Sequence, residues 1–185
     1  MFGPIAEPLR TSRLLLEPLA VHHAEEMAEV LDDPRLYEYI GGEPLSREEL
    51  RARYEHLVAG PAPFHQEYWL NWTVFRRRDG KAVGYVQATV TPAAGGLRAS
   101  VAWVTGINHQ GFGFATEAAA AMLAWLRAHG VTGISASIHP GNLASAGVAR
   151  KLGLHPTAEQ EDGETVWRDA PGRRRRAAGP NPPGR

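Results

Sequence analysis

Hydrophobic residues along the chain repeat at two spacings, one typical of helices and the other of strands. Apolar residues three or four positions apart predict four helices, over 20–30, 46–58, 114–129 and 143–152. Short apolar or alternating runs predict six strands, over 12–19, 71–75, 82–90, 98–105, 131–138 and 165–168. The chain therefore mixes both kinds of element along its length.

Turn and capping residues support these boundaries. Ser46, followed three residues later by Glu49, has the pattern of a capping box at a helix start. Asp79-Gly80 is a strong turn dipeptide between two strands and predicts a hairpin. Gly130 and Gly153 stand where the two later helices should end.

The order of the elements indicates the fold class. It runs strand, two helices, three strands, helix, strand, helix, strand. Three consecutive strands favour an antiparallel meander, and strand–helix–strand favours a parallel connection. The sequence therefore predicts an α/β protein with a mixed, mostly antiparallel sheet and helices on both faces.

Composition limits the function classes. At 185 residues the chain fits one domain with a substantial core. Its 20 basic and 20 acidic residues balance, so the net charge gives no indication of nucleic acid or a membrane as partner. The absence of cysteine excludes disulfides, thiolate catalysis and cysteine zinc sites.

The two ends of the sequence differ from the rest. Residues 1–8 lack the basic start and apolar core of a signal peptide. No apolar run approaches the ~20 residues that span a bilayer, so we expect a cytoplasmic protein. Proline, glycine and arginine dominate from Ala170 onward and predict a disordered tail over 170–185.

The most informative segment is the glycine-rich turn over 110–117, which joins the apolar run 101–104 to a helix. Glycine lets the backbone approach a ligand closely and adopt positive φ. A helix start presents unpaired N–H groups and the positive end of the helix dipole. Together these features predict a phosphate or pyrophosphate site, and hence a nucleotide-bearing cofactor.

Two common phosphate motifs do not fit this turn. A dinucleotide fingerprint needs a third glycine where Thr116 stands, and a P-loop needs Ser or Thr where Ala82 follows Gly80-Lys81. What remains, Gln110-x-x-Gly113-x-Ala115, resembles the acyl-CoA-binding motif of the GNAT superfamily of N-acetyltransferases. The wider stretch 103–118 is similar to the branch that acetylates ribosomal-protein N-termini.

The resemblance covers residues 10–169 and implies an N-acetyltransferase domain with the acyl-CoA N-acyltransferase fold. It implies acetyl-CoA as cosubstrate and no metal. It assigns the pyrophosphate to the turn and the first helical residues, and assigns the pantetheine arm to the backbone of the preceding strand. These residues are Val104, Thr105, Gln110, Gly111, Phe112, Gly113, Phe114, Ala115 and Thr116.

A second segment, 139–145, resembles the family's Asn-x-x-Ser box. By resemblance, Asn142 contacts the cofactor arm, and Ser145 protonates the leaving thiolate as the catalytic acid. Acyl transfer to an amine needs such a donor, because the departing sulfur becomes negative. The alternative is structural: Asn142 caps the following helix and Ser145 lies in its first turn. The two roles are compatible.

The general base is not assigned. Many relatives carry a glutamate at the start of the strand that precedes the turn, where this chain has Ser100. A water chain to bulk solvent could also deprotonate the amine. The candidate substitutes, each of which could equally be a solvated surface residue, are Glu159, Glu161, Glu164, Glu67 and His65.

Other conspicuous residues favour structural roles. Neighbouring histidines on a helix point about 100° apart, so His22 and His23 make a poor chelating pair. The tryptophans at 69, 72 and 103 should lie in the core or the wall of a cleft. The arginine runs 76–78 and 173–176 have no interleaved aromatic residues and are typical of solvated charge, although nucleic-acid contact is the alternative.

Two hypotheses follow. The first is an enzyme in which a primary amine, of a peptide N-terminus or a small molecule, attacks acetyl-CoA directly. The second is a binding module of the same fold that holds acyl-CoA without turnover, as a sensor or a partner-binding module, which the missing strand glutamate favours. We expect the first two helices and the loop 60–67 to line the acceptor site, and the protein to be a monomer or a homodimer.

Overall fold

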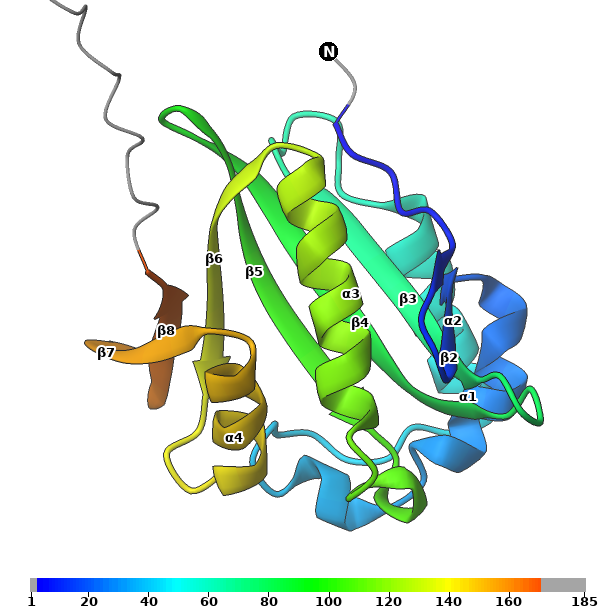
Figure 1. The fold of residues 1–185 in the computed structure, drawn as a ribbon. Helices are drawn as coiled ribbons and strands as arrows, with labels where there is room; N and C mark the ends of the chain where they lie inside the picture. The colour runs from blue at the N-terminus through cyan, green and yellow to red at the C-terminus, as the bar shows by residue number, and fades with distance from the viewer. Residues whose placement is uncertain (1–2, 171–185) are drawn as a thin grey trace, which may run out of the picture.

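The computed structural model describes residues 3–170, so the tail predicted over 170–185 lies outside the described residues except for Ala170. A mixed sheet of eight strands runs through the described chain, in the order β1-β2-β3-β4-β5-β6-β8-β7 (Figure 1). Neighbouring strands are antiparallel except for β5 and β6. The strands are β1 Leu9–Arg10, β2 Leu14–Pro18, β3 Tyr68–Arg76, β4 Ala82–Ala93, β5 Gly96–Thr105, β6 Val131–Ile138, β7 Leu154–Glu161 and β8 Glu164–Asp169.

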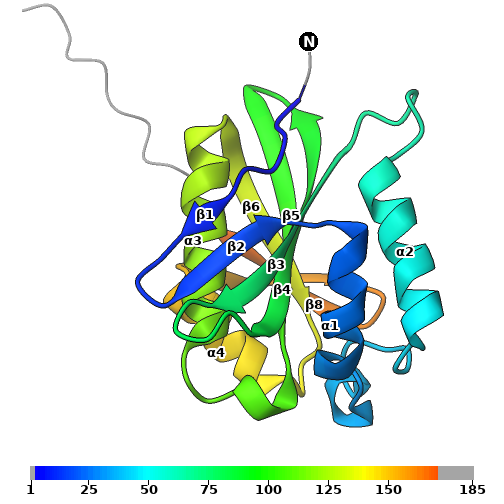
Figure 2. The same cartoon turned by 90° about the vertical axis from the view of Figure 1, so that its right-hand side faces the viewer.

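Helices cover both faces of this sheet, as the sequence predicted (Figures 1 and 2). α3 and α4 lie on one face, and α1 and α2 lie on the other. No helix within residues 3–170 combines the length and the apolar character that a membrane span requires. The helices are α1 Ala24–Val30, α2 Arg47–Ala59, α3 Phe114–Ala128 and α4 Leu143–Lys151, with short 3-10 turns η1 Val21–His23, η2 Pro34–Tyr37 and η3 Ile107–His109.

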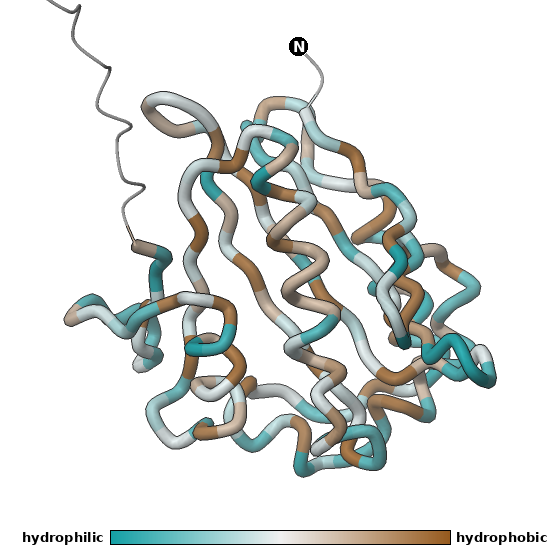
Figure 3. Tube along the Cα trace, viewed as in Figure 1, coloured by the Kyte–Doolittle hydropathy of each residue, from teal (hydrophilic) through white to brown (hydrophobic). Residues whose placement is uncertain are grey.

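The larger core lies between α3 and the sheet. Ala118, Met122 and Leu126 follow each other at helical spacing and are all buried. They pack with Trp72 of β3, whose ring meets that of Trp125 edge to face at 5.6 Å. In Figure 3 hydrophobic residues recur along the strands, whereas the turn between β3 and β4 is strongly hydrophilic. This core fixes the position of the N-terminus of α3 relative to the sheet.

The sheet opens between β5 and β6. These parallel strands pair over a short stretch that ends at Ser100 and Ser135. Beyond it, β5 continues to Thr105 with β4 as its partner, while β6 pairs with β8. In the described residues the edge of β5 from Val101 to Thr105 therefore has no strand on its β6 side. This edge belongs to the strand whose backbone the family resemblance assigned to the pantetheine arm.

Two strands were missed. β1 has only two residues, too few for any pattern. β7 is an edge strand whose residues after Leu154 are mostly exposed and polar, and its register with β8 shifts between Pro156 and Gln160. An exposed edge does not require alternating apolar residues, so the sequence carried no strand signal there.

The other predicted elements exist with shifted ends. The helix predicted over 20–30 begins as the 3-10 turn η1 and becomes α-helical only at Ala24. The first predicted strand is shorter, because β2 starts at Leu14. The capping box of α2 is confirmed: the Ser46 hydroxyl accepts from the Glu49 N–H at 3.1 Å, and the Glu49 carboxylate accepts from the Ser46 N–H at 2.7 Å.

Candidate active site

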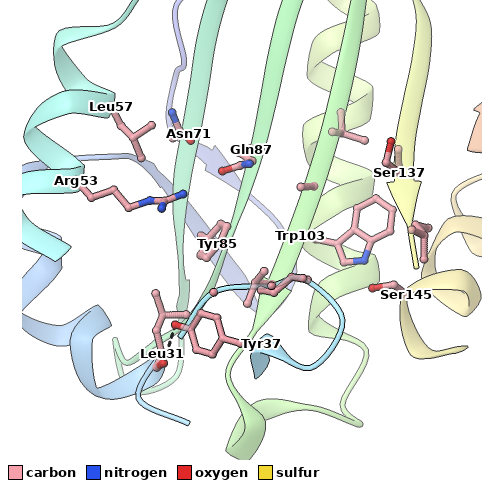
Figure 4. A pocket seen from close by; sticks show the side chains of 18 of the residues that line it. Leu31, Tyr37, Arg53, Leu57, Asn71, Tyr85, Gln87, Trp103, Ser137 and Ser145 are labelled. Atoms are coloured by element: carbon pink, nitrogen blue, oxygen red, sulfur yellow. Dashed lines mark hydrogen bonds between the residues drawn. The ribbon is translucent and has the colours of Figure 1, made fainter. Parts of the chain in front are cut away.

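A cavity of about 620 Å³ lies where β5 and β6 separate (Figure 4). That volume falls within the range of roughly 300–1,000 Å³ of small-molecule sites. The cavity extends from α2 across β3, β4 and β5 to β6 and the start of α4. Its polar and aromatic lining includes Arg53, Asn71, Tyr85, Gln87, Trp103, Ser137 and Ser145.

The glycine-rich turn after β5 presents a row of free N–H groups. Gly111 and Gly113 have φ of 84° and 82°, in the left-handed region that favours glycine. Gly113 is the N-cap of α3 and provides no side chain to satisfy the first turn. The backbone N–H groups of residues 113–116 donate to no acceptor within residues 3–170. Such a row at a helix N-terminus is suited to an anion.

The side chains of the turn have separate positions. The Gln110 amide donates to the Thr105 carbonyl at 3.0 Å, which ties the turn to the end of β5. The Phe112 ring is 59% exposed and lies 5.8 Å from the ring of Phe114, which is buried. The half-buried Ala115 and Thr116 form the first turn of α3, and the half-buried Val104, at the end of β5, lines the cavity.

A charged cluster anchors the N-terminus of α3 to the β1–β2 turn. The Glu117 carboxylate accepts from the Thr11 hydroxyl at 2.6 Å and from the Arg13 Nε at 2.8 Å. Burial alone would raise the pKa of Glu117, but these hydrogen bonds and the charge of Arg13 hold it below its usual value. The Arg13 guanidinium also lies over the Phe114 ring at 4.7 Å. Sequence reasoning missed Arg13, because the fold alone brings it to this turn.

Asn142 and Ser145 meet at the start of α4. The Asn142 Oδ1 accepts from the Ser145 backbone N–H at 3.2 Å, so Asn142 caps the helix. Both residues line the cavity, and Figure 4 shows Ser145 on the same side of the cavity as the Trp103 ring. The Ser145 hydroxyl has no hydrogen-bond partner in the described chain. Asn142 therefore has the structural role of capping α4, while the Ser145 hydroxyl takes no part in the cap and stays accessible from the cavity.

Most candidate bases lie outside the cavity. Glu159 pairs with Arg168 at 2.7 Å, and Glu161 accepts from the Ser137 hydroxyl at 3.2 Å. Glu67 accepts from the indole N–H of Trp69 at 3.0 Å. His65 lies in the loop before β3, and neither it nor Glu67 lines the cavity.

Glu164 is the candidate base that does line the cavity. It begins β8, beside the end of β6, to which β8 pairs. Burial raises the pKa of its carboxyl above the usual value; the nearby His139 opposes this, and Glu161 and Asp162 add to it. A carboxylate with a raised pKa is better matched to accepting a proton near neutral pH.

The lining of the cavity on the α2 side differs in part from the lining that the sequence predicted for an acceptor site. α2 contributes as predicted, but the α1 region supplies only Leu31, at the C-cap of that helix. The loop 60–67 does not line the cavity. Residues from the segment 37–45, between η2 and α2, take that place instead. This segment has no helical or strand repeat, so no local pattern could indicate that it lies over the sheet.

His23 has a structural role. It is 5% exposed, and its Nδ1 lies 2.8 Å from the Thr73 hydroxyl while its Nε2 lies 3.1 Å from the Glu17 carboxylate. Burial lowers its pKa, against the opposing effect of Glu17. The ring therefore joins η1 to β2 and β3. Within residues 3–170, no group of three His, Cys, Asp or Glu residues could hold a metal ion.

The remaining conspicuous residues also have structural positions. Trp72 is fully buried beneath α3, whereas the half-buried Trp103 forms a cavity wall. Arg76 pairs with Asp79 at 2.6 Å, and Arg77 donates to the carbonyls of Thr11 and Ser12 at 2.8 and 2.9 Å. Arg76 therefore helps to close the β3–β4 turn, and Arg77 ties that turn to the β1–β2 turn. The run 173–176 lies outside the described residues.

Comparison with known proteins agrees with this geometry. The family model described as "Acetyltransferase (GNAT) domain" matches residues 13–155. No curated protein matches the chain in sequence.

Solved structures share the fold at low sequence identity. An acetyltransferase of the GNAT family from Bacillus anthracis is 19% identical, with a TM-score of 0.67, covering 88% of this chain and 95% of its own. The ribosomal L7/L12 alpha-N-protein acetyltransferase RimL, in complex with coenzyme A, is 17% identical, with a TM-score of 0.71. The match covers 88% of this chain and 97% of the RimL chain. The microcin C7 self-immunity acetyltransferase MccE, in complex with acetyl-CoA and AMP, is 16% identical, with a TM-score of 0.70. The match covers 86% of this chain and 93% of the MccE chain.

Proposed function

The chain belongs to the GNAT acetyltransferase family, and from this premise we propose that it transfers an acetyl group from acetyl-CoA to a primary amine. The observation that carries the proposal is the row of N–H groups at residues 113–116, which have no acceptor within residues 3–170 and lie shortly after the β5 edge that β6 leaves open. Structures of two similar proteins hold CoA or acetyl-CoA, which supports the choice of cosubstrate.

The residues of the turn fit a pyrophosphate. The free N–H groups at the start of α3 supply donors, and Gly111 and Gly113 leave the backbone uncovered by side chains. Gln110 holds the turn against Thr105, and Phe112, Phe114, Ala115 and Thr116 complete it. The open edge of β5 at Val104 and Thr105 can bond the amide groups of the pantetheine arm, with Asn142 at the far side.

The chemistry balances between the two substrates. The free amine forms a bond with the acetyl carbon, the carbon–sulfur bond breaks, and CoA leaves as a thiolate. We assign Ser145 as the acid that protonates the sulfur and Glu164 as the base that accepts the proton lost by the amine. Both groups then exchange protons with solvent. We propose direct transfer, and the absence of cysteine supports this because it excludes a cysteine thioester intermediate.

Two kinds of acceptor fit this chemistry, a peptide N-terminus and a small-molecule amine. RimL, described as an alpha-N-protein acetyltransferase, supports the first. A non-catalytic acyl-CoA sensor is the alternative function, favoured by the exposed Ser100 at the position where relatives carry a glutamate.

The test is release of CoA thiol from acetyl-CoA in the presence of peptides, polyamines and amino acids, one amine at a time. The proposal expects thiol release that depends on the amine and follows its concentration. Tight binding of acetyl-CoA without turnover on any amine would instead support the sensor.

A further inference from the structure

The part of the cavity beneath α2 contains an arginine, Arg53, that forms no ion pair with any residue in 3–170, although Glu43 and Glu164 also line the cavity. Building on the proposed function, we propose that Arg53 binds a carboxylate of the acceptor, and that the preferred acceptor is a peptide N-terminus with an acidic side chain at its second or third residue. Arg53 would then be the residue that determines acceptor specificity.

Arg53 differs from the other arginines of α2. Arg47 and Arg51 both approach Glu25, at 3.4 and 3.8 Å, on the side of the helix that meets α1. Arg53 makes no ion pair or side-chain hydrogen bond with any residue in 3–170. Its side chain extends from α2 over the sheet toward Tyr85 instead (Figure 4). It is the one lysine or arginine among the described residues that line the cavity.

The surroundings of Arg53 are suited to a polar ligand. Burial raises the pKa of the Tyr54 and Tyr85 hydroxyls, and the charge of Arg53 opposes that rise at both, as expected of close neighbours. Asn71 and Gln87 lie opposite each other in the register of β3 and β4. Neither of their side chains has a hydrogen-bond partner in the part of the chain that the structure describes. They are therefore free to bond the backbone of an acceptor.

The position of Arg53 sets the length of the acceptor. Arg53 lies near β3, whereas Trp103 and Ser145 lie beyond β4, at the opening between β5 and β6 (Figure 4). Strands in a sheet are about 4.8 Å apart, so β3 and β5 are separated by roughly 10 Å. An extended chain spans about 3.3–3.6 Å per residue. A side chain on the second or third residue can bridge this distance, whereas the carboxylate of a free α-amino acid cannot.

Arginine is well suited to this recognition. Its planar guanidinium binds a carboxylate through two parallel hydrogen bonds, which adds geometric selectivity to charge. A hydrogen bond to a charged group contributes enough for a preference of about 10- to 100-fold in kcat/KM. The same chemistry is offered by an elongated small molecule with an amine and a carboxylate about 10 Å apart, and the assay separates that source from a peptide.

The experiment compares peptides that differ only in one charge. The full chain is assayed by thiol release with free-amine peptides carrying Glu or Gln at the second, third or sixth residue, and with a long-chain amino acid and its amide. Arg53→Gln is compared with Arg51→Gln, a matched control on the same helix, because Arg51 pairs with Glu25 and Glu55 and does not line the cavity.

We expect the wild-type protein to prefer Glu over Gln at the second or third residue by about 10- to 100-fold in kcat/KM, mainly through KM, and to show no preference at the sixth. Arg53→Gln should abolish the preference by lowering kcat/KM for the Glu peptide to that of the Gln peptide, and Arg51→Gln should retain it. A preference shown by the long-chain amino acid alone would overturn the peptide assignment. Equal use of the charged and neutral peptides would overturn the proposal as a whole, although turnover would still support acetyl transfer.

If no amine supports thiol release, the proposed function fails, and calorimetry with the CoA-bound protein decides the present proposal separately. Tighter binding of the Glu peptide that depends on Arg53 would sustain it. Equal binding of the two peptides would reject it.

Discussion

The Ser145 hydroxyl is the residue-scale feature most directly tied to chemistry. The cap of α4 uses the Asn142 side chain and the Ser145 backbone N–H, so the hydroxyl is not required for the helix. Ser145→Ala should therefore lower kcat by about 10- to 1,000-fold, the scale of one acid or charge-stabilising group. The KM for acetyl-CoA and the melting temperature should change little. Steady-state kinetics and a melting curve on the same variant measure both.

The matched variants for this prediction are Ser145→Thr, which keeps a hydroxyl, and Asn142→Ala. Removal of the Asn142 cap should cost about 1 kcal/mol of stability. If Ser145→Ala lowers the melting temperature and preserves kcat, Ser145 is structural, and another donor protonates the thiolate.

The Glu164 carboxylate is expected to control the acidic side of the pH profile. Because burial raises its pKa, the base form is lost at a higher pH than for an ordinary glutamate as the solution is acidified. Activity should therefore be present above this raised pKa and fall as the pH drops through it. Glu164→Gln should lower kcat by about 100-fold or more and remove that limb of the profile.

Glu159→Gln is the control for Glu164, since Glu159 lies on the adjacent strand and pairs with Arg168 outside the cavity. It should leave kcat and the pH profile unchanged. An intact acidic limb in Glu164→Gln would show that the amine is deprotonated by another route, such as water.

At the scale of elements, the turn between β5 and α3 depends on the backbone of Gly113. A Cβ there would lie no closer than 3.5 Å to Arg13, so space permits a side chain, but φ of 82° does not suit a β-branched residue. Gly113→Val should distort the row of N–H groups and weaken acetyl-CoA binding about 10-fold or more. Calorimetry on the folded variant measures this.

Gly95→Val provides the matched control. Gly95 has φ of 81° in the turn between β4 and β5, and a Cβ added there would meet no atom of residues 3–170 within 4 Å. The same backbone strain at Gly95 should cost stability and leave the affinity for acetyl-CoA unchanged. Equal affinity in the two variants would remove the phosphate-turn assignment.

The sequence predicted those helices, strands and caps that depend on residues close together in the chain. The helix of α3, the capping box of α2 and the strand of β6 each depend on neighbours a few residues away, and all three are present, with only the end of α3 shifted by one residue. β7 was not predicted from the sequence, because an exposed edge strand does not require an apolar repeat. Its absence from the prediction did not alter the fold class, since β6 and β8 still pair.

The composition of the site was harder to predict than the elements. The phosphate turn is one contiguous segment, so its residues could be named from sequence. Arg53, Glu164 and Arg13 lie far from that turn in the chain and reach their positions only through helix placement and strand register. From sequence, Glu164 was only one of several candidate carboxylates, and the structure shows that it lines the cavity whereas the others do not.

At the scale of the whole molecule, the arrangement suits direct transfer across the opening in the sheet. The phosphate turn follows the open end of β5, the α2 side is where we propose that the acceptor binds, and Ser145 and Glu164 line the cavity from α4 and β8. The chain lacks a cysteine that could take up the acetyl group in between. The central claim is therefore that the acetyl group moves from CoA to the amine in a single step.

The most direct test follows an isotopically labelled acetyl group in a single turnover. The full chain is mixed with labelled acetyl-CoA and a free-amine peptide, and intact masses of protein and peptide are recorded over time, with an N-terminally blocked peptide as control. Direct transfer predicts label on the free-amine peptide alone, in step with thiol release, and none on the protein. Label held covalently by the protein, or no amine-dependent transfer at all, would contradict it.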